Sequence, residues 1–124
     1  MSTTGQLLRS ISQLIDSEPR NAARDPQAQL FARVGKVCEE SGEVFAALIA
    51  ATGANPRKHE PGSLDEVERE LFDVAVGALL AIAHLHTRTP QDQHTDLIEE
   101  LEDRIRAVAR LYEIDPASGR PTHP

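Results

Sequence analysis

The 124-residue sequence has few aromatic residues and a single cysteine. It contains three Phe, one Tyr and no Trp, so a folded core must be built mainly from aliphatic side chains. The lone Cys38 cannot form a disulfide within the chain, which favours a reducing compartment such as the cytoplasm. The N-terminus also lacks a charged flank followed by a long apolar run, so no secretion signal is expected.

Long apolar runs and an excess of positive charge are lacking too. The richest apolar stretch, Val74 to Leu85, is shorter than the roughly 20 residues that span a bilayer and contains His84. Twenty acidic residues against thirteen basic ones give a formal net charge of −7, which opposes binding to nucleic acid or anionic lipid. We therefore expect neither a membrane nor a nucleic-acid partner, and a polyanionic ligand would need cations beside it.

The sequence does contain apolar residues at helical spacing. They recur every three or four positions over 7–15, 27–52, 64–87 and 90–112, a period that predicts helices. Turn-forming residues occupy 18–26, and Gly53 marks the end of the second helix. Ser63, followed three residues later by Glu66, is a capping-box pattern that marks the start of the third. Thr89 and Pro90 are typical of a helix start and predict that of the last helix.

These patterns predict one all-α domain over residues 1–115, with a four-helix bundle-like architecture, and a flexible C-terminal tail over 116–124. The third helix is apolar around most of its circumference, so we expect it to be the most buried one. Cys38, Phe45 and Phe72 lie on apolar stripes and are expected in the core. One chain cannot cover all this apolar surface, which predicts a homo-oligomer, either a homodimer or a homotetramer.

Two acidic clusters lie on the second and third helices. Glu40 and Glu43 are three positions apart, as are Glu70 and Asp73, so each pair shares one helical face. If the two helices pack antiparallel, the four carboxylates converge, and their repulsion then requires a cation or shared protons. Hard carboxylate oxygens suit Mg²⁺ or Mn²⁺.

A plainer interpretation is that these carboxylates face water. Glu39, Glu40 and Glu43 lie opposite the apolar stripe of their helix, as a solvated face would. Glu70 and Asp73 are instead interleaved with apolar residues, and burial of an unpaired carboxylate costs several kcal/mol. The two clusters together therefore favour a functional site.

The two acidic motifs occur in a fixed order. Residues 36–44 read Lys-Val-Cys-Glu-Glu-Ser-Gly-Glu-Val, and residues 70–74 read Glu-Leu-Phe-Asp-Val. Their order, separation and place on two long helices resemble the MazG-like family of the all-α NTP pyrophosphohydrolases, over roughly residues 31–85. The resemblance implies a MazG-type fold and a hydrolase. It also implies that the enzyme cuts a nucleoside triphosphate between the α and β phosphates and releases a nucleoside monophosphate and pyrophosphate.

The resemblance also implies roles for individual residues. The implied magnesium ligands are Glu40, Glu43, Glu70 and Asp73. Glu39 would act as the catalytic carboxylate that orients or deprotonates the attacking water. Lys36 would bind a phosphate, the alternative being an ion pair with Glu40 one turn along the helix. Arg57 and Lys58 would bind the triphosphate, the alternative being a solvated loop.

A second hypothesis is a non-catalytic helical dimer that keeps a metal or nucleotide regulatory site. All four ligand positions and Glu39 are acidic, which favours catalysis. His84, on the same stripe as Asp73, would either contact a nucleoside or be a hydrogen-bonded core residue. The sequence leaves the nucleotide substrate open.

Overall fold

The computed structural model describes residues 2–54 and 62–123. Its helices are α1 (Thr3–Ser17), α2 (Pro19–Ala22), α3 (Pro26–Thr52), α4 (Leu64–His86), the short 3-10 helix η1 (Pro90–Asp92) and α5 (Leu97–Leu111). These two ranges hold no strand, apart from one isolated bridge between Ile114 and Pro121. None of the helices within them has the length and apolarity needed to cross a bilayer. The predicted all-helical fold is confirmed.

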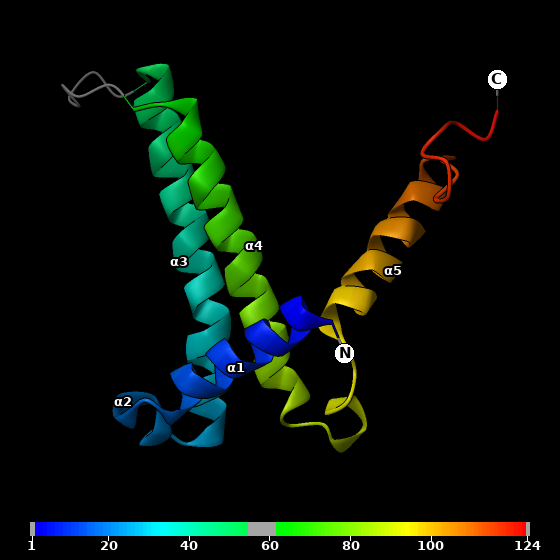
Figure 1. Cartoon of the computed structure of the whole chain (residues 1–124). Coiled ribbons are helices and arrows are strands. Elements are labelled where there is room, and N and C mark those ends of the chain that lie inside the picture. Colours follow the sequence, from blue (N-terminus) through cyan, green and yellow to red (C-terminus); the bar gives the residue numbers. More distant parts are fainter. Residues whose placement is uncertain (1, 55–61, 124) are drawn as a thin grey trace.

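α3 and α4 form a long hairpin and lie side by side over most of their lengths (Figure 1). Near the closed end, the N–H of Gly62 donates to the carbonyl of Ala50 at 3.2 Å. Toward the other end, the Arg33 guanidinium donates to the carbonyl of Leu80 at 3.0 Å. Both contacts fit one antiparallel register, with the start of α4 beside the end of α3.

Three residues cap the helices of this hairpin, and two of them, Gly53 and Ser63, were predicted to mark helix ends. The carboxylate of Asp25 accepts the N–H of Ala28 at 2.9 Å and so begins α3. Gly53 ends α3 in the left-handed conformation, with φ of 67°, which glycine adopts without steric cost. The hydroxyl of Ser63 accepts the N–H of Glu66 at 3.3 Å and so begins α4. The predicted boundaries of both long helices are confirmed.

The connection predicted over 18–26 contains a short helix. Pro19 occupies the first turn of α2, and the carboxylate of Glu18 accepts the N–H of Arg20 at 3.0 Å. Proline suits a first helical turn because its missing N–H has no helical partner there. The same proline that ends α1 therefore begins α2.

The predicted start of the last helix is wrong. Thr89 and Pro90 begin only the single turn of η1, and α5 starts seven residues later at Leu97. The carboxylate of Asp96 accepts the N–H of Ile98 at 3.0 Å and caps α5. A Thr-Pro pair suits the first turn of a 3-10 helix as well as that of an α-helix, and it does not specify how far the helix continues.

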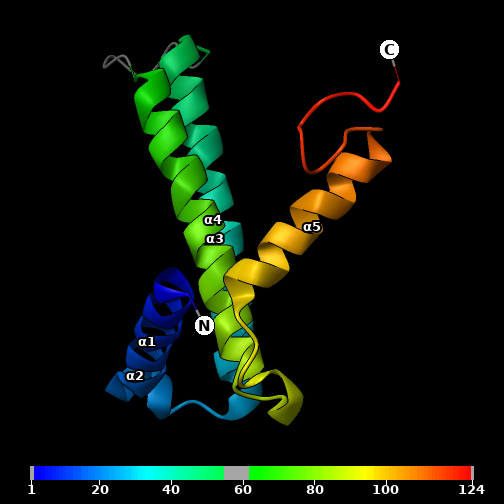
Figure 2. The ribbon, with the colours of Figure 1, turned by 45° about the vertical axis from the view of Figure 1, so that its right-hand side comes forward.

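The core is small and lies where α1 crosses the second half of α4 (Figures 1 and 2). Its buried members are Leu8 of α1, Ala83 of α4 and Leu97 of α5. Partly buried apolar residues pack against them, namely Leu79, Leu80 and Ile98. Burial of α4 is thus concentrated in its second half, where Ala81, Ala83, His84 and His86 are buried.

Part of the predicted core is exposed. The side chains of Phe45 and Phe72 are 65% and 63% exposed, and Cys38 is exposed as well. Among the described helices, α3 is the one that packs against the first half of α4, because α1 covers the other half (Figure 2). Helical spacing placed these residues on the apolar stripes of α3 and α4, but the part of the chain that the structure describes leaves them uncovered.

α5 diverges from the α3–α4 pair in both views (Figures 1 and 2). It joins the core through Leu97 and Ile98 in its first turn. Further along, Ile105, Val108 and Leu111 are 59%, 51% and 81% exposed. Within one chain, α5 is therefore not part of a closed four-helix bundle.

The chain folds back after α5. The N–H of Thr122 donates to the carbonyl of Glu113 at 2.8 Å, and the Ser118 hydroxyl donates to the carboxylate of Asp115 at 2.6 Å. These bonds fold the segment 116–123 back onto residues 113–115. Its predicted flexibility stays a prediction.

Asp96 ties the start of the chain to the start of α5. Its buried carboxylate accepts the backbone N–H of Ser2 and the Ser2 hydroxyl, the latter at 3.1 Å, besides capping α5. The bond from the Ser2 N–H is the main cause that holds the pKa of Asp96 below its ordinary value, against the opposing effect of desolvation. The charged form of Asp96 is therefore the one that stabilises the fold.

We expect this link to weaken in acid. Because the folded pKa of Asp96 lies below the unfolded value of about 3.9, its stabilising effect is present above that pH and is lost as the pH falls through the folded pKa. Asp96→Asn should lower the melting temperature at neutral pH and make it less sensitive to acid, as measured by circular dichroism. Asp103→Asn removes an equal charge from an exposed site and should keep the wild-type pH dependence. Equal pH dependence in Asp96→Asn and wild type would contradict this assignment.

Candidate metal centre

Three of the predicted acidic side chains meet between α3 and α4. One carboxylate oxygen from each of Glu40, Glu43 and Glu70 lies within 4.8 Å of the other two. The hairpin register explains this, because Val37 faces Gly77 and the same register carries Glu43 to the level of Glu70. We refer to Glu40, Glu43 and Glu70 as the acidic cluster.

The acidic cluster is electrostatically unfavourable by itself. The charge of Glu40 and a side-chain hydrogen bond with it raise the pKa of Glu43, and Glu70 raises it further, while Lys36 acts in the opposite direction. Oε2 of Glu70 is buried and has no hydrogen-bond partner among the described residues. A hard cation with oxygen ligands would relieve both the repulsion and the unpaired oxygen. The residues present therefore fit a magnesium or manganese ion.

Asp73 stands apart from the acidic cluster. It is exposed and is not among the three residues whose oxygens come together. It lines a cleft with Glu40 and Lys36, so it lies next to the cluster on the same side of the hairpin. Its role as a fourth ligand stays a prediction.

Lys36 pairs with two of the predicted site residues. Its Nζ lies 3.1 Å from Oε1 of Glu40 and 3.4 Å from Oε1 of Glu39, and the hydrogen bond with Glu40 is the main cause that raises the pKa of Lys36. The ion pair offered as the alternative for Lys36 is thus present. Glu39 itself is 61% exposed, against 15% for Glu40, and lies outside the acidic cluster. Arg57 and Lys58 lie outside the described residues.

A cleft of about 540 Å³ runs from the acidic cluster toward α1 and α2. At one end lie the carboxylates of Glu40 and Asp73, and the walls carry the cations of Arg24, Arg33 and Lys36. Apolar side chains complete the lining, among them Ile15, Val76 and Leu80. Such a lining suits a ligand with both a phosphorylated end and a less polar end.

Arg33 is a cleft residue that the sequence analysis missed. Its Nη2 donates to the hydroxyl of Ser12 at 2.6 Å and to the carbonyl of Leu80 at 3.0 Å, while its Nε lies 3.7 Å from Oδ1 of Asp16. Burial lowers the pKa of Arg33, and the charge of Asp16 partly offsets this effect. An arginine next to Val34 in an apolar stripe was the signal that could have identified it.

His84 belongs to the same buried network. Its Nδ1 lies 2.7 Å from Oδ2 of Asp16, and the residue is 3% exposed. Of the two roles left open for His84, this contact favours the hydrogen-bonded core residue. Asp16 thus joins α1 to both α3 and α4, through Arg33 and His84 respectively.

Removal of one charge from the acidic cluster should stabilise the metal-free protein. Glu43→Gln leaves the side-chain shape almost unchanged and ends the repulsion with Glu40 and Glu70, so the melting temperature in EDTA should rise. The same variant should lose the rise in melting temperature that Mg²⁺ gives the wild type, because a ligand is gone. Differential scanning fluorimetry with EDTA or Mg²⁺ measures both effects. Glu68→Gln, an exposed change on α4, should behave as wild type, and a Glu43→Gln protein still stabilised by Mg²⁺ would contradict the assignment.

The chemistry available at this place combines oxygen ligands for a hard cation with a cation-lined cleft. Within 2–54 and 62–123, neither the acidic cluster nor the cleft lining includes a cysteine or a histidine that would suit a softer metal. No protein-family model, curated protein or solved structure matches this chain.

Proposed function

We propose that this protein is a magnesium-dependent nucleoside triphosphate pyrophosphohydrolase, as its resemblance to the MazG-like family implies. The observation that carries the proposal is the approach of the Glu40, Glu43 and Glu70 oxygens to within 4.8 Å of one another, with a buried Glu70 oxygen that has no partner among the described residues. Such a group is costly without a cation, and hydrolysis of a phosphoric anhydride is a reaction that a cation promotes.

Each acidic residue has a proposed role. Glu40, Glu43 and Glu70 hold Mg²⁺, for which Mn²⁺ can substitute, and Asp73 at the edge of the cleft is the fourth ligand. A bound magnesium ion supplies charge neutralisation at phosphate oxygens and acidifies water. Glu39 orients or deprotonates the attacking water, after a local rearrangement that releases it from Lys36.

The basic residues of the cleft have the complementary role. Lys36 and Arg33 line it next to Glu40, where their N–H groups can donate to phosphate oxygens. Arg57 and Lys58 of the 53–62 loop supply further positive charge to the triphosphate. A cleft of about 540 Å³ falls within the ~300–1,000 Å³ that small-molecule sites occupy.

The assembly we propose is a homodimer or a homotetramer that completes a four-helix bundle. The uncovered apolar residues of α3, α4 and α5 support this proposal, since Phe31, Phe45 and Phe72 are 69%, 65% and 63% exposed and Leu111 is 81% exposed. The lone Cys38 agrees with a cytoplasmic location.

An assay with a panel of ribo- and deoxyribonucleoside triphosphates tests the proposed activity. With Mg²⁺, at least one nucleotide should yield its monophosphate and pyrophosphate, identified by phosphorus NMR, and EDTA should stop the reaction. A nucleoside diphosphate with inorganic phosphate as products would contradict the proposal. Magnesium-dependent nucleotide binding without turnover would instead support the alternative, a non-catalytic helical dimer with a regulatory site.

A further inference from the structure

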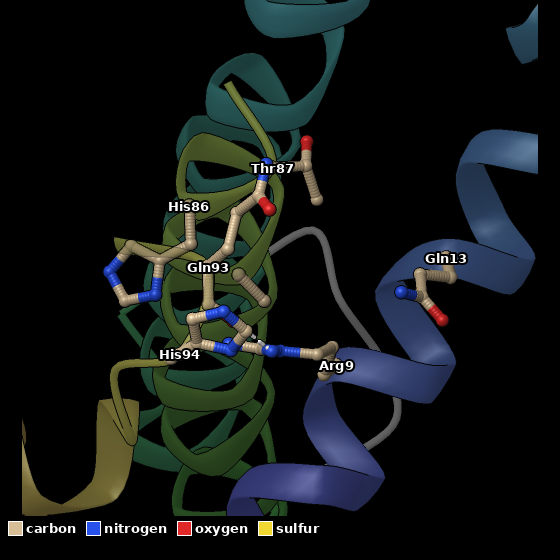
Figure 3. Close-up of a pocket in the computed structure, with 7 residues that line it drawn as sticks. Arg9, Gln13, His86, Thr87, Gln93 and His94 are labelled. Atoms are coloured by element: carbon tan, nitrogen blue, oxygen red, sulfur yellow. Dashed lines mark hydrogen bonds between the residues drawn. The ribbon is translucent and has the colours of Figure 1, made fainter. Parts of the chain in front are cut away.

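A second cavity, of about 320 Å³, lies far from the acidic cluster. It opens between α1, the end of α4 and the segment that follows η1 (Figure 3). Its polar lining residues are Arg9, Gln13, His86, Thr87, Gln93 and His94. His86 and Glu70 lie on the same helix, and the helical rise separates them by roughly 24 Å. The cavity is therefore separate from the proposed catalytic site.

Among the described residues, the lining of this cavity is rich in hydrogen-bond donors and contains no Asp or Glu, although the protein carries a net charge of −7. The Arg9 guanidinium donates to the backbone carbonyl of Gln93 and, at 3.3 Å, to that of Thr95. These carbonyls fix the position of the guanidinium without neutralising its charge. A guanidinium has five N–H donors, so others are left for a ligand.

His86 lines this cavity with a side chain that is mostly buried. Its side chain is 9% exposed, and its Nε2 lies 3.2 Å from Oε2 of Glu100. Nδ1 is buried and has no hydrogen-bond partner among the described residues. Because the carboxylate of Glu100 accepts the Nε2 proton, a neutral His86 presents a bare acceptor at Nδ1, and a protonated His86 presents a donor there.

We propose that this cavity binds the phosphate group of a small phosphorylated anion. A monohydrogen phosphate carries both an O–H group and acceptor oxygens, so it can pair with Nδ1 of His86 in either protonation state, once a small turn of the ring exposes that nitrogen to the cavity. Its other oxygens accept from Arg9 and from His94, whose side chains border the same space (Figure 3). An ionised carboxylate offers acceptors only and leaves a neutral Nδ1 unpaired.

Titration of the full chain with inorganic phosphate, in EDTA, tests this site without metal at the acidic cluster. Nitrogen-15 NMR of the histidine side chains should show saturable shifts at His86 and His94. A backbone amide spectrum of the same samples should show no shift at Glu40 or Glu70. Arg9→Gln should weaken phosphate binding at least about tenfold, because it removes charge-assisted hydrogen bonds. His94→Ala changes an exposed residue and should weaken binding without unfolding the protein.

Arg20→Gln is the matched control, since it removes an exposed arginine that does not line the cavity. It should leave phosphate affinity unchanged. Shifts that do not saturate, an equal loss of affinity in Arg9→Gln and Arg20→Gln, or acetate binding as tight as phosphate binding would each overturn the proposal. None of these results depends on whether the acidic cluster hydrolyses nucleotides.

Discussion

Glu70→Gln is expected to weaken magnesium binding and pyrophosphate release together, with turnover at least ~100-fold lower. Glu70 belongs to the acidic cluster, and its Oε2 is buried and has no partner among the described residues. An amide of almost the same shape lacks the negative charge that makes a carboxylate a strong ligand for Mg²⁺. Steady-state pyrophosphate release and calorimetric magnesium titration on the same preparation measure the two losses.

Two companion variants give this prediction its control. Glu39→Gln should leave magnesium affinity nearly intact while it lowers turnover by about 100-fold, because a water-orienting base acts mainly in the transition state. Glu68→Gln, exposed on the same helix as Glu70, should change neither quantity. Full activity in Glu70→Gln would refute the site, and loss of metal binding in Glu39→Gln would make Glu39 a ligand.

Arg33→Leu should reduce the free energy of unfolding by ~3 kcal/mol. The side chain of Arg33 is 11% exposed and pairs with Asp16, Ser12 and the carbonyl of Leu80. Its removal leaves a partly buried carboxylate and a carbonyl with fewer partners, which is more costly than the loss of an exposed ion pair. Urea unfolding followed by circular dichroism measures the change.

A double-mutant cycle separates this pairing from the general effect of a buried leucine. In an Asp16→Leu background, Arg33→Leu should cost clearly less than in wild type, because the charge that Arg33 neutralises is already gone. Arg69→Leu replaces an exposed arginine of α4 and should stay within ~0.5 kcal/mol of wild type. Additive costs of Arg33→Leu and Asp16→Leu would show that the two residues do not stabilise each other.

The hairpin and its acidic cluster follow from local features of the sequence. The apolar spacing, with Gly53 and Ser63 as caps, was enough to predict α3 and α4 to within a few residues. Once two helices pack antiparallel, spacing alone brings Glu40 and Glu43 near Glu70.

Other features depend on contacts between distant segments. The pairing of Asp16 with Arg33 and His84 joins three helices, and the spacing within any one helix contains no information about it. The start of α5 at Leu97 depends on Asp96, which is also held by Ser2. The exposure of Phe45 and Phe72 was missed because periodicity identifies an apolar face but does not tell whether the same chain covers it.

Magnesium binding by the nucleotide-free protein is the most direct test of the proposed metal centre. Calorimetry should compare wild type with the triple variant Glu40→Gln, Glu43→Gln and Glu70→Gln. We expect saturable magnesium binding by wild type and none by the triple variant. In EDTA, the triple variant should melt at a temperature no lower than that of wild type, because the repulsion among the three carboxylates is removed. Equal binding by the two proteins, or no binding by wild type, would contradict a magnesium site at Glu40, Glu43 and Glu70.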